Sequence, residues 1–176
     1  MKLLSERTLC KGKRVELIQR VYSYDGEEFI RDIVHFGHAV AALPLMGDEV
    51  LLIKQFRVPV NSWVLEIPAG RVEHGENLED AVKRELIEEI GYIPHHIEKI
   101  VSIYMAPGYS DEVLHIFLAT DLEYVGSKPE PGELIEVVKV KVNHMLDTLL
   151  KCEVTDAKTL VAISTYLQLR GTLSGK

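Results

Sequence analysis

Three glutamates close together on a predicted helix are the residues of this sequence best suited to chemistry. The segment 70–92 (GRVEHGENLEDAVKRELIEEIGY) places Glu85, Glu88 and Glu89 at positions i, i+3 and i+4, so they share one flank of a helix. Carboxylates this close repel one another, and a cation between them removes the repulsion. Their oxygen atoms are hard ligands that suit Mg²⁺ or Mn²⁺. The alternative is an acidic helix face exposed to water.

The helix that must position these acids has recognisable ends. Asn77 is a favourable N-cap residue, Asp80 is an approximate capping-box partner, and Gly91 suits the position after the last turn. Apolar residues recur at every fourth position between these ends: Leu78, Val82, Leu86 and Ile90. The pattern predicts an amphipathic helix of about four turns. We also expect Arg84 to pair with Glu76 and so to fix the loop that enters the helix.

Eight spaced residues of this segment resemble the box motif of the Nudix hydrolases. Gly70 is followed after five residues by Glu76, and after seven more by Arg84-Glu85-Leu86-x-Glu88-Glu89-x-Gly91. The residue after the last glycine is usually aliphatic in that family and is Tyr92 here, an apolar-for-apolar change. The resemblance implies an α/β (α+β) fold, a Nudix-type α/β/α sandwich with a mixed sheet and an N-terminal antiparallel β region.

The resemblance also implies a metal site and a reaction. Glu85 and Glu89 match the principal metal ligands, Glu88 matches a third ligand or an acid beside them, and the carbonyl group of Ala69 matches a backbone ligand. Arg84 belongs to the same catalytic set. The implied cofactor is Mg²⁺, with Mn²⁺ as a substitute, and such ions would screen a diphosphate and lower the pKa of bound water. The implied reaction is attack by water at phosphorus in a nucleoside diphosphate linked to another moiety.

Further segments resemble the ADP-ribose pyrophosphatases among the Nudix hydrolases. Pro107 lies fifteen residues after Tyr92, in the loop 106–112 (APGYSDE), and the runs 63–70 (WVLEIPAG) and 54–57 (KQFR) also match. In that loop Glu112 matches the glutamate that takes the proton from the attacking water, and Asp111 is the competing candidate. A tight turn is the alternative explanation of the loop.

Substrate contacts follow from the same resemblance. The residues assigned to substrate binding are Arg57, Arg31, Glu66, Gly108 and Glu73. A guanidinium group such as that of Arg57 can grip two phosphate oxygens, although an exposed arginine at a strand end is the alternative. Arg31 is expected to reach the substrate of a second copy, because this subfamily typically forms dimers with exchanged N-terminal strands. Tyr24, Phe29 and Phe36 offer flat surfaces to adenine, but such residues more often pack in a core or hairpin.

The leading hypothesis is therefore metal-dependent hydrolysis of ADP-ribose to AMP and ribose 5-phosphate. A pyrophosphatase for another nucleoside diphosphate sugar, such as GDP-mannose or ADP-glucose, is the neighbouring alternative. A third is a non-catalytic sensor that binds ADP-ribose, but such a protein would be expected to lose carboxylates of the box, and none is missing here.

Composition limits the partners and the compartment. A chain of 176 residues can bury a sizeable core, and 20 basic against 27 acidic residues give a net charge of −7. No basic stripe is present, so we expect no nucleic-acid partner. The longest apolar run is too short to span a membrane, and Cys10 and Cys152 have no CxxC partner, which favours a reduced compartment. We expect a cytoplasmic homodimer.

The rest of the chain is predicted to be β structure before the helix and mixed after it. Strands are expected at 13–24 and 27–36, joined by a hairpin turn at Asp25-Gly26, and then at 38–45, 49–58, 63–70, 97–105, 113–122 and 134–142. Two helices close the chain, the first capped by Asn143 and the last capped by Thr155 or Asp156 and ending at Gly171. We divide the chain into a hairpin region of residues 1–36, expected to dimerise, and a Nudix domain of residues 37–176.

Overall fold

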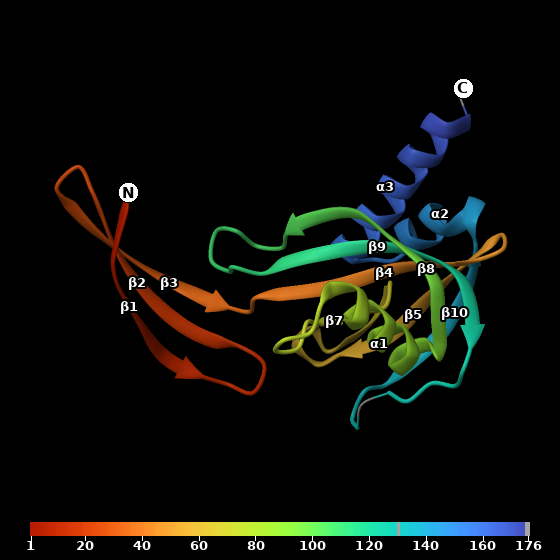
Figure 1. Cartoon of the computed structure of the whole chain (residues 1–176), viewed down its shortest axis with the longest axis horizontal. Helices are drawn as coiled ribbons and strands as arrows, with labels where there is room; N and C mark the ends of the chain where they lie inside the picture. The colour runs from red at the N-terminus through yellow and green to blue at the C-terminus, as the bar shows by residue number, and fades with distance from the viewer. Residues whose placement is uncertain (130, 175–176) are drawn as a thin grey trace. The chain divides into compact units, whose positions relative to one another are not determined.

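The computed structural model describes residues 1–129 and 131–174, and most of them lie in β-strands (Figure 1). The chain divides into two compact units. The first unit combines Met1–Ala39 with Ser102–Leu114, and the second combines Val40–Val101 with His115–Lys176. None of the helices in the described part of the chain is both long enough and apolar enough to cross a membrane.

The first unit is built on a three-stranded antiparallel sheet. Its strands are β1 (Lys2–Lys11), β2 (Glu16–Tyr24) and β3 (Glu27–His35), in the order β1-β2-β3. Asp25 and Gly26 both have positive φ, 51° and 81°, as the predicted hairpin turn requires. Strand β1 was not predicted, because all ten of its residues are exposed and no alternation of apolar and polar residues marks it.

The loop 106–112 belongs to the first unit and is hydrogen-bonded to the end of β3. The amide of Val34 donates to the carbonyl of Tyr109 at 2.8 Å, and the amide of Asp111 donates to the carbonyl of Val34 at 3.4 Å. The chain bearing Pro107 is therefore tied to strand β3 by backbone contacts.

The second unit is a seven-stranded sheet covered by helices. Its strands are β4 (His38–Met46), β5 (Glu49–Arg57), β6 (Ser62–Glu66), β7 (Ala69–Arg71), β8 (Tyr92–Tyr104), β9 (Val113–Tyr124) and β10 (Ile135–Lys141). Their order is β10-β5-β4-β9-β8, with β6 on β5 and β7 on β4. Helix α1 (Leu78–Ile90) lies on one side of this sheet, and α2 (Met145–Leu150) and α3 (Ala157–Ser174) lie on the other (Figure 1). The predicted α/β class with a sheet between helices is confirmed.

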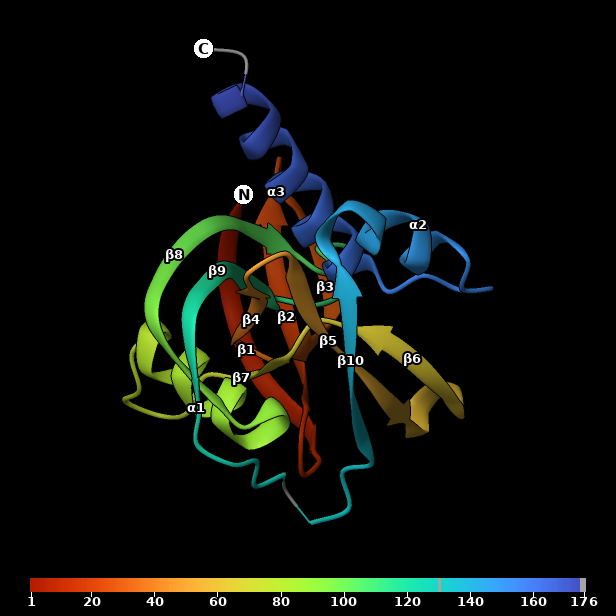
Figure 2. The same ribbon diagram turned by 90° about the vertical axis from the view of Figure 1, so that its right-hand side faces the viewer.

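The edges of β4 and β5 receive the segment that leads into the box. The two strands pair at Leu45↔Val50 and Met46↔Glu49, beside the turn at Gly47. Strand β6 then pairs with β5 from Ile53↔Glu66 to Arg57↔Ser62, and β7 pairs with β4 (Figure 2). The chain thus passes from β5 to β4 through segment 62–71, and β7 comes to lie against α1.

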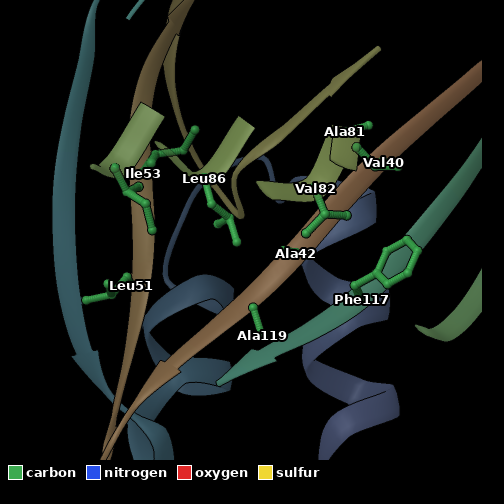
Figure 3. Close-up of a cluster of buried hydrophobic side chains, with 10 residues drawn as sticks. Val40, Ala42, Leu51, Ile53, Ala81, Val82, Leu86, Phe117 and Ala119 are labelled. Carbon is green, nitrogen blue, oxygen red and sulfur yellow. The ribbon is translucent and has the colours of Figure 1, made fainter. Parts of the chain in front are cut away.

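Helix α1 packs on the sheet through the face predicted from the sequence. The buried cluster takes residues from β4, β5, α1 and β9 (Figure 3): Val40, Ala42, Leu51, Ile53, Ala81, Val82, Leu86, Ile90, Phe117 and Ala119. Alternate residues of a strand point to opposite faces of the sheet, so the helices on the far side cover the other set. The apolar face of α1 fixes the rotation of the helix and hence the direction of its acidic flank.

Both predicted ends of α1 are confirmed. The Oδ1 atom of Asn77 accepts a hydrogen bond from the amide of Asp80 at 2.9 Å. Gly91 adopts the left-handed conformation with φ 79°, and a Cβ atom there would lie 2.6 Å from the amide nitrogen of Ser127. The carbonyl of Gly91 accepts from the amides of Val125 and Gly126. The loop after β9 is therefore bound to the end of α1 at a position that only glycine suits.

The later elements differ from the prediction at their ends. Strand β8 begins at Tyr92, directly after the helix, rather than at residue 97. A 3₁₀ turn, Val142–His144, precedes α2, and the N-cap residue is His144, so the predicted cap by Asn143 is wrong. Asp156 is confirmed ahead of α3, since its Oδ2 atom accepts from the amide of Thr159 at 2.9 Å. Helix α3 continues past Gly171 to Ser174.

Candidate active site

Two carboxyl groups of α1 are buried against the backbone of β7. Glu89 is 5% exposed, and its Oε2 atom accepts a hydrogen bond from the amide of Ala69 at 3.0 Å. Glu85 is largely buried, and a Cβ atom at Gly70 would lie 1.9 Å from its Oε1 atom. A side chain at the box glycine would therefore displace the Glu85 carboxylate from its place beside β7.

Burial changes the protonation of this pair. Removal from water raises the pKa of Glu85 to about 7, against the lowering effect of the Arg84 guanidinium. Burial also raises the pKa of Glu89 to about 8, and the negative charge of Glu85 adds to the rise. The two carboxyl groups are thus held in a site where their negative charge is only partly compensated.

The donor set fits a divalent cation. Carboxylate oxygens at Glu85 and Glu89 are hard ligands, and a positive ion between them would offset both the burial and the repulsion. Within residues 1–129 and 131–174, no three acidic, histidine or cysteine side chains already converge as a metal site. Instead, the Nη1 atom of Arg84 donates to Glu85 at 2.6 Å and to Glu88 at 3.1 Å. A cation at Glu85 would therefore compete with Arg84.

Arg84 also holds the loop that enters the helix, as predicted. Its Nε and Nη2 atoms donate to the two carboxylate oxygens of Glu76 at 2.9 and 3.0 Å, and Nη2 donates to the carbonyl of Arg71 at 2.8 Å. Glu76 in turn accepts from the amide of Glu73, whose side chain is exposed. One guanidinium group therefore joins the acidic flank of α1 to the loop between β7 and α1.

Arg57 is a second arginine that is paired with a glutamate, Glu66. The Nε and Nη2 atoms of Arg57 donate to the two oxygens of Glu66 at 2.7 and 2.8 Å. The side chain of Arg57 is 31% exposed and that of Glu66 is 1% exposed. The negative charge of Glu89 also acts on Arg57. The structure thus brings the predicted phosphate-binding arginine close to the box acids, whereas Glu66 is buried behind it.

Glu133 is a further acid near the box that the sequence analysis missed. It is half-buried just before β10, and its negative charge contributes to the raised pKa of both Glu85 and Glu89. The next residue, Leu134, accepts a backbone hydrogen bond from Phe56 of β5. No local motif marks Glu133. The signal that could have found it is its place at the end of the polar loop 125–133, directly before the strand predicted at 134–142.

The two candidate bases of the loop 106–112 have different surroundings within the first unit. The Oδ2 atom of Asp111 lies 2.5 Å from Nδ1 of His35, and Oδ1 accepts from the amides of Phe36 and Gly37. Burial raises the pKa of Asp111, but the hydrogen bonds from Phe36, His35 and Gly37 outweigh it and lower the pKa. Asp111 is therefore occupied in holding the loop, and the assignment of Glu112 stays a prediction.

A cavity of about 490 Å³ in the first unit brings together other residues assigned to the substrate. Its lining combines arginine and aromatic side chains with the glycine of the loop: Arg20, Tyr22, Tyr24, Phe29, Arg31 and Gly108. The guanidinium carbon of Arg31 lies 5.8 Å from the ring centroid of Phe29. This combination of a flat ring and a cation is suited to an aromatic base.

Comparison with known proteins agrees with this geometry. A family model described as the NUDIX domain matches residues 35–161. The chain is 38% identical to the ADP-ribose pyrophosphatase of Bacillus subtilis (strain 168), with 100% of both chains covered, and 29% identical to the methanol dehydrogenase activator of Bacillus methanolicus, with 99% of both covered. The chain therefore belongs to the Nudix family of hydrolases.

A solved structure has the same fold. It is described as an ADP compounds hydrolase and matches with a TM-score of 0.85 and 23% identity, covering 99% of this chain and 96% of its own. The predicted fold and the family predicted from the box are confirmed.

The raised pKa values of the box acids predict how stability depends on pH when divalent metal is chelated. The unfolded chain loses the two protons near the ordinary value of 4.5, whereas the folded chain keeps them up to about 7 and 8. The folded state therefore binds more protons between these values, and stability falls as pH rises. We expect the Tm in EDTA to decrease between about pH 5 and about pH 9, and Glu89→Gln to reduce this decrease.

The control for this measurement is Glu79→Gln, which changes an exposed acid in the first turn of the same helix. It should keep the slope of Tm against pH seen in the unsubstituted protein. An unchanged slope in Glu89→Gln would contradict the proposed origin of the effect.

Proposed function

We propose that this Nudix hydrolase cleaves the diphosphate bond of ADP-ribose with water to give AMP and ribose 5-phosphate, with Mg²⁺ as its cofactor and Mn²⁺ as a substitute. The observation that carries the proposal is the buried pair Glu85 and Glu89, with the charge of Arg57 beside it. The full-length relative from Bacillus subtilis, named an ADP-ribose pyrophosphatase, supports the substrate class.

Each side chain has a physical role in this reaction. Glu85 and Glu89, with Glu88 and the carbonyl of Ala69, would hold divalent cations, which screen the diphosphate charge and lower the pKa of bound water. Arg57 would bind phosphate oxygens, because a guanidinium group presents several donors in a fixed plane. Arg84 orients the acids and holds the loop that carries Glu73.

The cavity of the first unit supports a place for the adenine base. Phe29 offers a flat ring and Arg31 a cation, and Gly108 leaves its part of the lining without a side chain. In the dimer proposed below, Arg31 would contact the substrate of the other copy. A related nucleoside diphosphate sugar such as ADP-glucose or GDP-mannose is the alternative substrate, and kcat/KM measured across such a panel decides between them.

The first test is metal-dependent turnover. We expect AMP release from ADP-ribose in the presence of Mg²⁺, and none after EDTA treatment. Glu85→Gln should lower kcat by roughly a hundredfold or more, since it removes a charged ligand. Glu79→Gln serves as the matched control on the same helix and should keep full activity. Absence of metal-dependent AMP release from the unsubstituted protein would refute the proposal.

The second test identifies the carboxylate that accepts the proton from water. Resemblance favours Glu112, whereas Glu133 is the acid whose charge acts on both Glu85 and Glu89. We expect Glu133→Gln to lower kcat by about 10²–10⁴-fold with little change in KM. The acidic limb of its pH–rate profile should also be lost. A larger loss in Glu112→Gln would assign the base to the loop 106–112 instead.

The third test concerns the homodimer. Leu17 and Ile30 are exposed, 37% and 57%, and the pairings Leu17↔Val34 and Val21↔Ile30 place them on one face of the N-terminal sheet. We propose that this face packs on a second copy. Light scattering should give twice the chain mass of 19.9 kDa, and Leu17→Asp with Ile30→Asp should give the monomer. Glu27→Lys, which changes an exposed residue on the opposite face of the same sheet, is the control, and a monomeric unsubstituted protein would refute the dimer.

A further inference from the structure

A group of buried charges joins helix α3 to the end of β6. Glu66 is 1% exposed and accepts hydrogen bonds from Arg57 on one side and from the Nζ atom of Lys158 on the other. Lys158 is 9% exposed and also donates to Oδ1 of Asp156 at 3.2 Å. The amide of Ile67 donates to Oγ1 of Thr159 at 2.8 Å, which fixes the start of α3 against β6.

The position of Lys158 is not explained by the stability of α3. Lys158 is the second residue of the helix, where the positive end of the helix dipole disfavours a cation. Asp156 already satisfies the helix end through the amide and hydroxyl groups of Thr159. Burying an ammonium group is costly unless it is paired, so the partner that accounts for Lys158 is Glu66.

Lys158 changes the charge that Arg57 presents. A carboxylate paired with an arginine offsets most of the positive charge of the arginine. Arg57 and Glu66 alone would therefore present almost no net charge to a diphosphate. Lys158 binds the same Oε2 atom of Glu66 as Arg57 does and offsets that negative charge from the buried side. The charge of Asp156 is in turn opposed by the hydrogen bonds at the start of α3.

Arg57 remains able to bind a ligand in this arrangement. A guanidinium group has five N–H donors, and among the described residues Glu66 is the acceptor that engages it, through two of them. Its side chain is 31% exposed, whereas Glu66 and Lys158 are buried. The exposed part of the group is therefore an arginine whose counter-ion is already neutralised.

We infer that Lys158 is a positioning residue: it neutralises Glu66 from behind, so that Arg57 is both held in place and left with its positive charge for the diphosphate of the substrate. The inference rests on the proposed role of Arg57 in phosphate binding. Lys158 itself touches no reacting atom, and its effect should appear in binding rather than in the chemical step.

The test compares two substitutions that change the charge in opposite directions. Lys158→Met removes the positive charge and keeps the apolar stem, and we expect KM for ADP-ribose to rise about fivefold with kcat changed less than twofold. Asp156→Asn removes a negative charge and keeps an oxygen for the helix cap, and KM should fall about twofold. Lys158→Arg, which keeps the positive charge, should have the KM of the unsubstituted protein. In an Arg57→Met background, Lys158→Met should have no further effect on KM.

Binding of ADP in EDTA, measured by calorimetry, keeps the inference separate from the proposed reaction. The Kd for ADP should shift in the same directions as KM even if ADP-ribose proves not to be the substrate. Lys141→Met is the matched control, because Lys141 pairs with Asp48 on an exposed turn. Weaker ADP binding in both Lys158→Met and Asp156→Asn, or no change in either, would show a structural role and overturn the inference.

Discussion

The burial of two like-charged carboxyl groups at one point is the constraint on which the structure depends. Glu85 and Glu89 lie against the backbone of Ala69 and Gly70, and burial raises the pKa of both, while the charge of Glu85 adds to the rise at Glu89. Such a pair is costly for a fold. The arrangement persists because the apolar face of α1 is fixed in the core, and because β7 approaches closely where glycine replaces a side chain.

Two arginines near this pair of acids are each held by two hydrogen bonds to one glutamate. Arg84 binds Glu76 and Arg57 binds Glu66, in each case with Nε and Nη2 on the two carboxylate oxygens. The two ion pairs differ in burial, because Glu66 is far less exposed than Glu76. Glu66 also accepts a hydrogen bond from a lysine, Lys158. Arg84 is thereby balanced by its acids and serves to hold the entry loop, whereas Arg57 retains an excess of positive charge.

The sequence predicted what is decided within a few residues and missed what depends on distant contacts. Asn77 and Gly91 mark the ends of α1 through bonds to residues three or four positions away, so both were recognised. Strand β1 has no buried side and hence no periodic pattern. The cap at Asn143 was wrong because the chain first makes a 3₁₀ turn. Lys158 meets Glu66 across 92 positions, which no local pattern can reveal.

The same distinction explains why the box predicts a reaction more readily than a substrate. The acids, their glycine and Arg84 lie within one continuous segment of the second unit, and their geometry follows from one helix and one short strand. The cavity with Phe29 and Arg31 belongs to the first unit and is assembled from β2, β3 and a loop after β8. Side chains that line this cavity can therefore change without altering the segment that holds the acids.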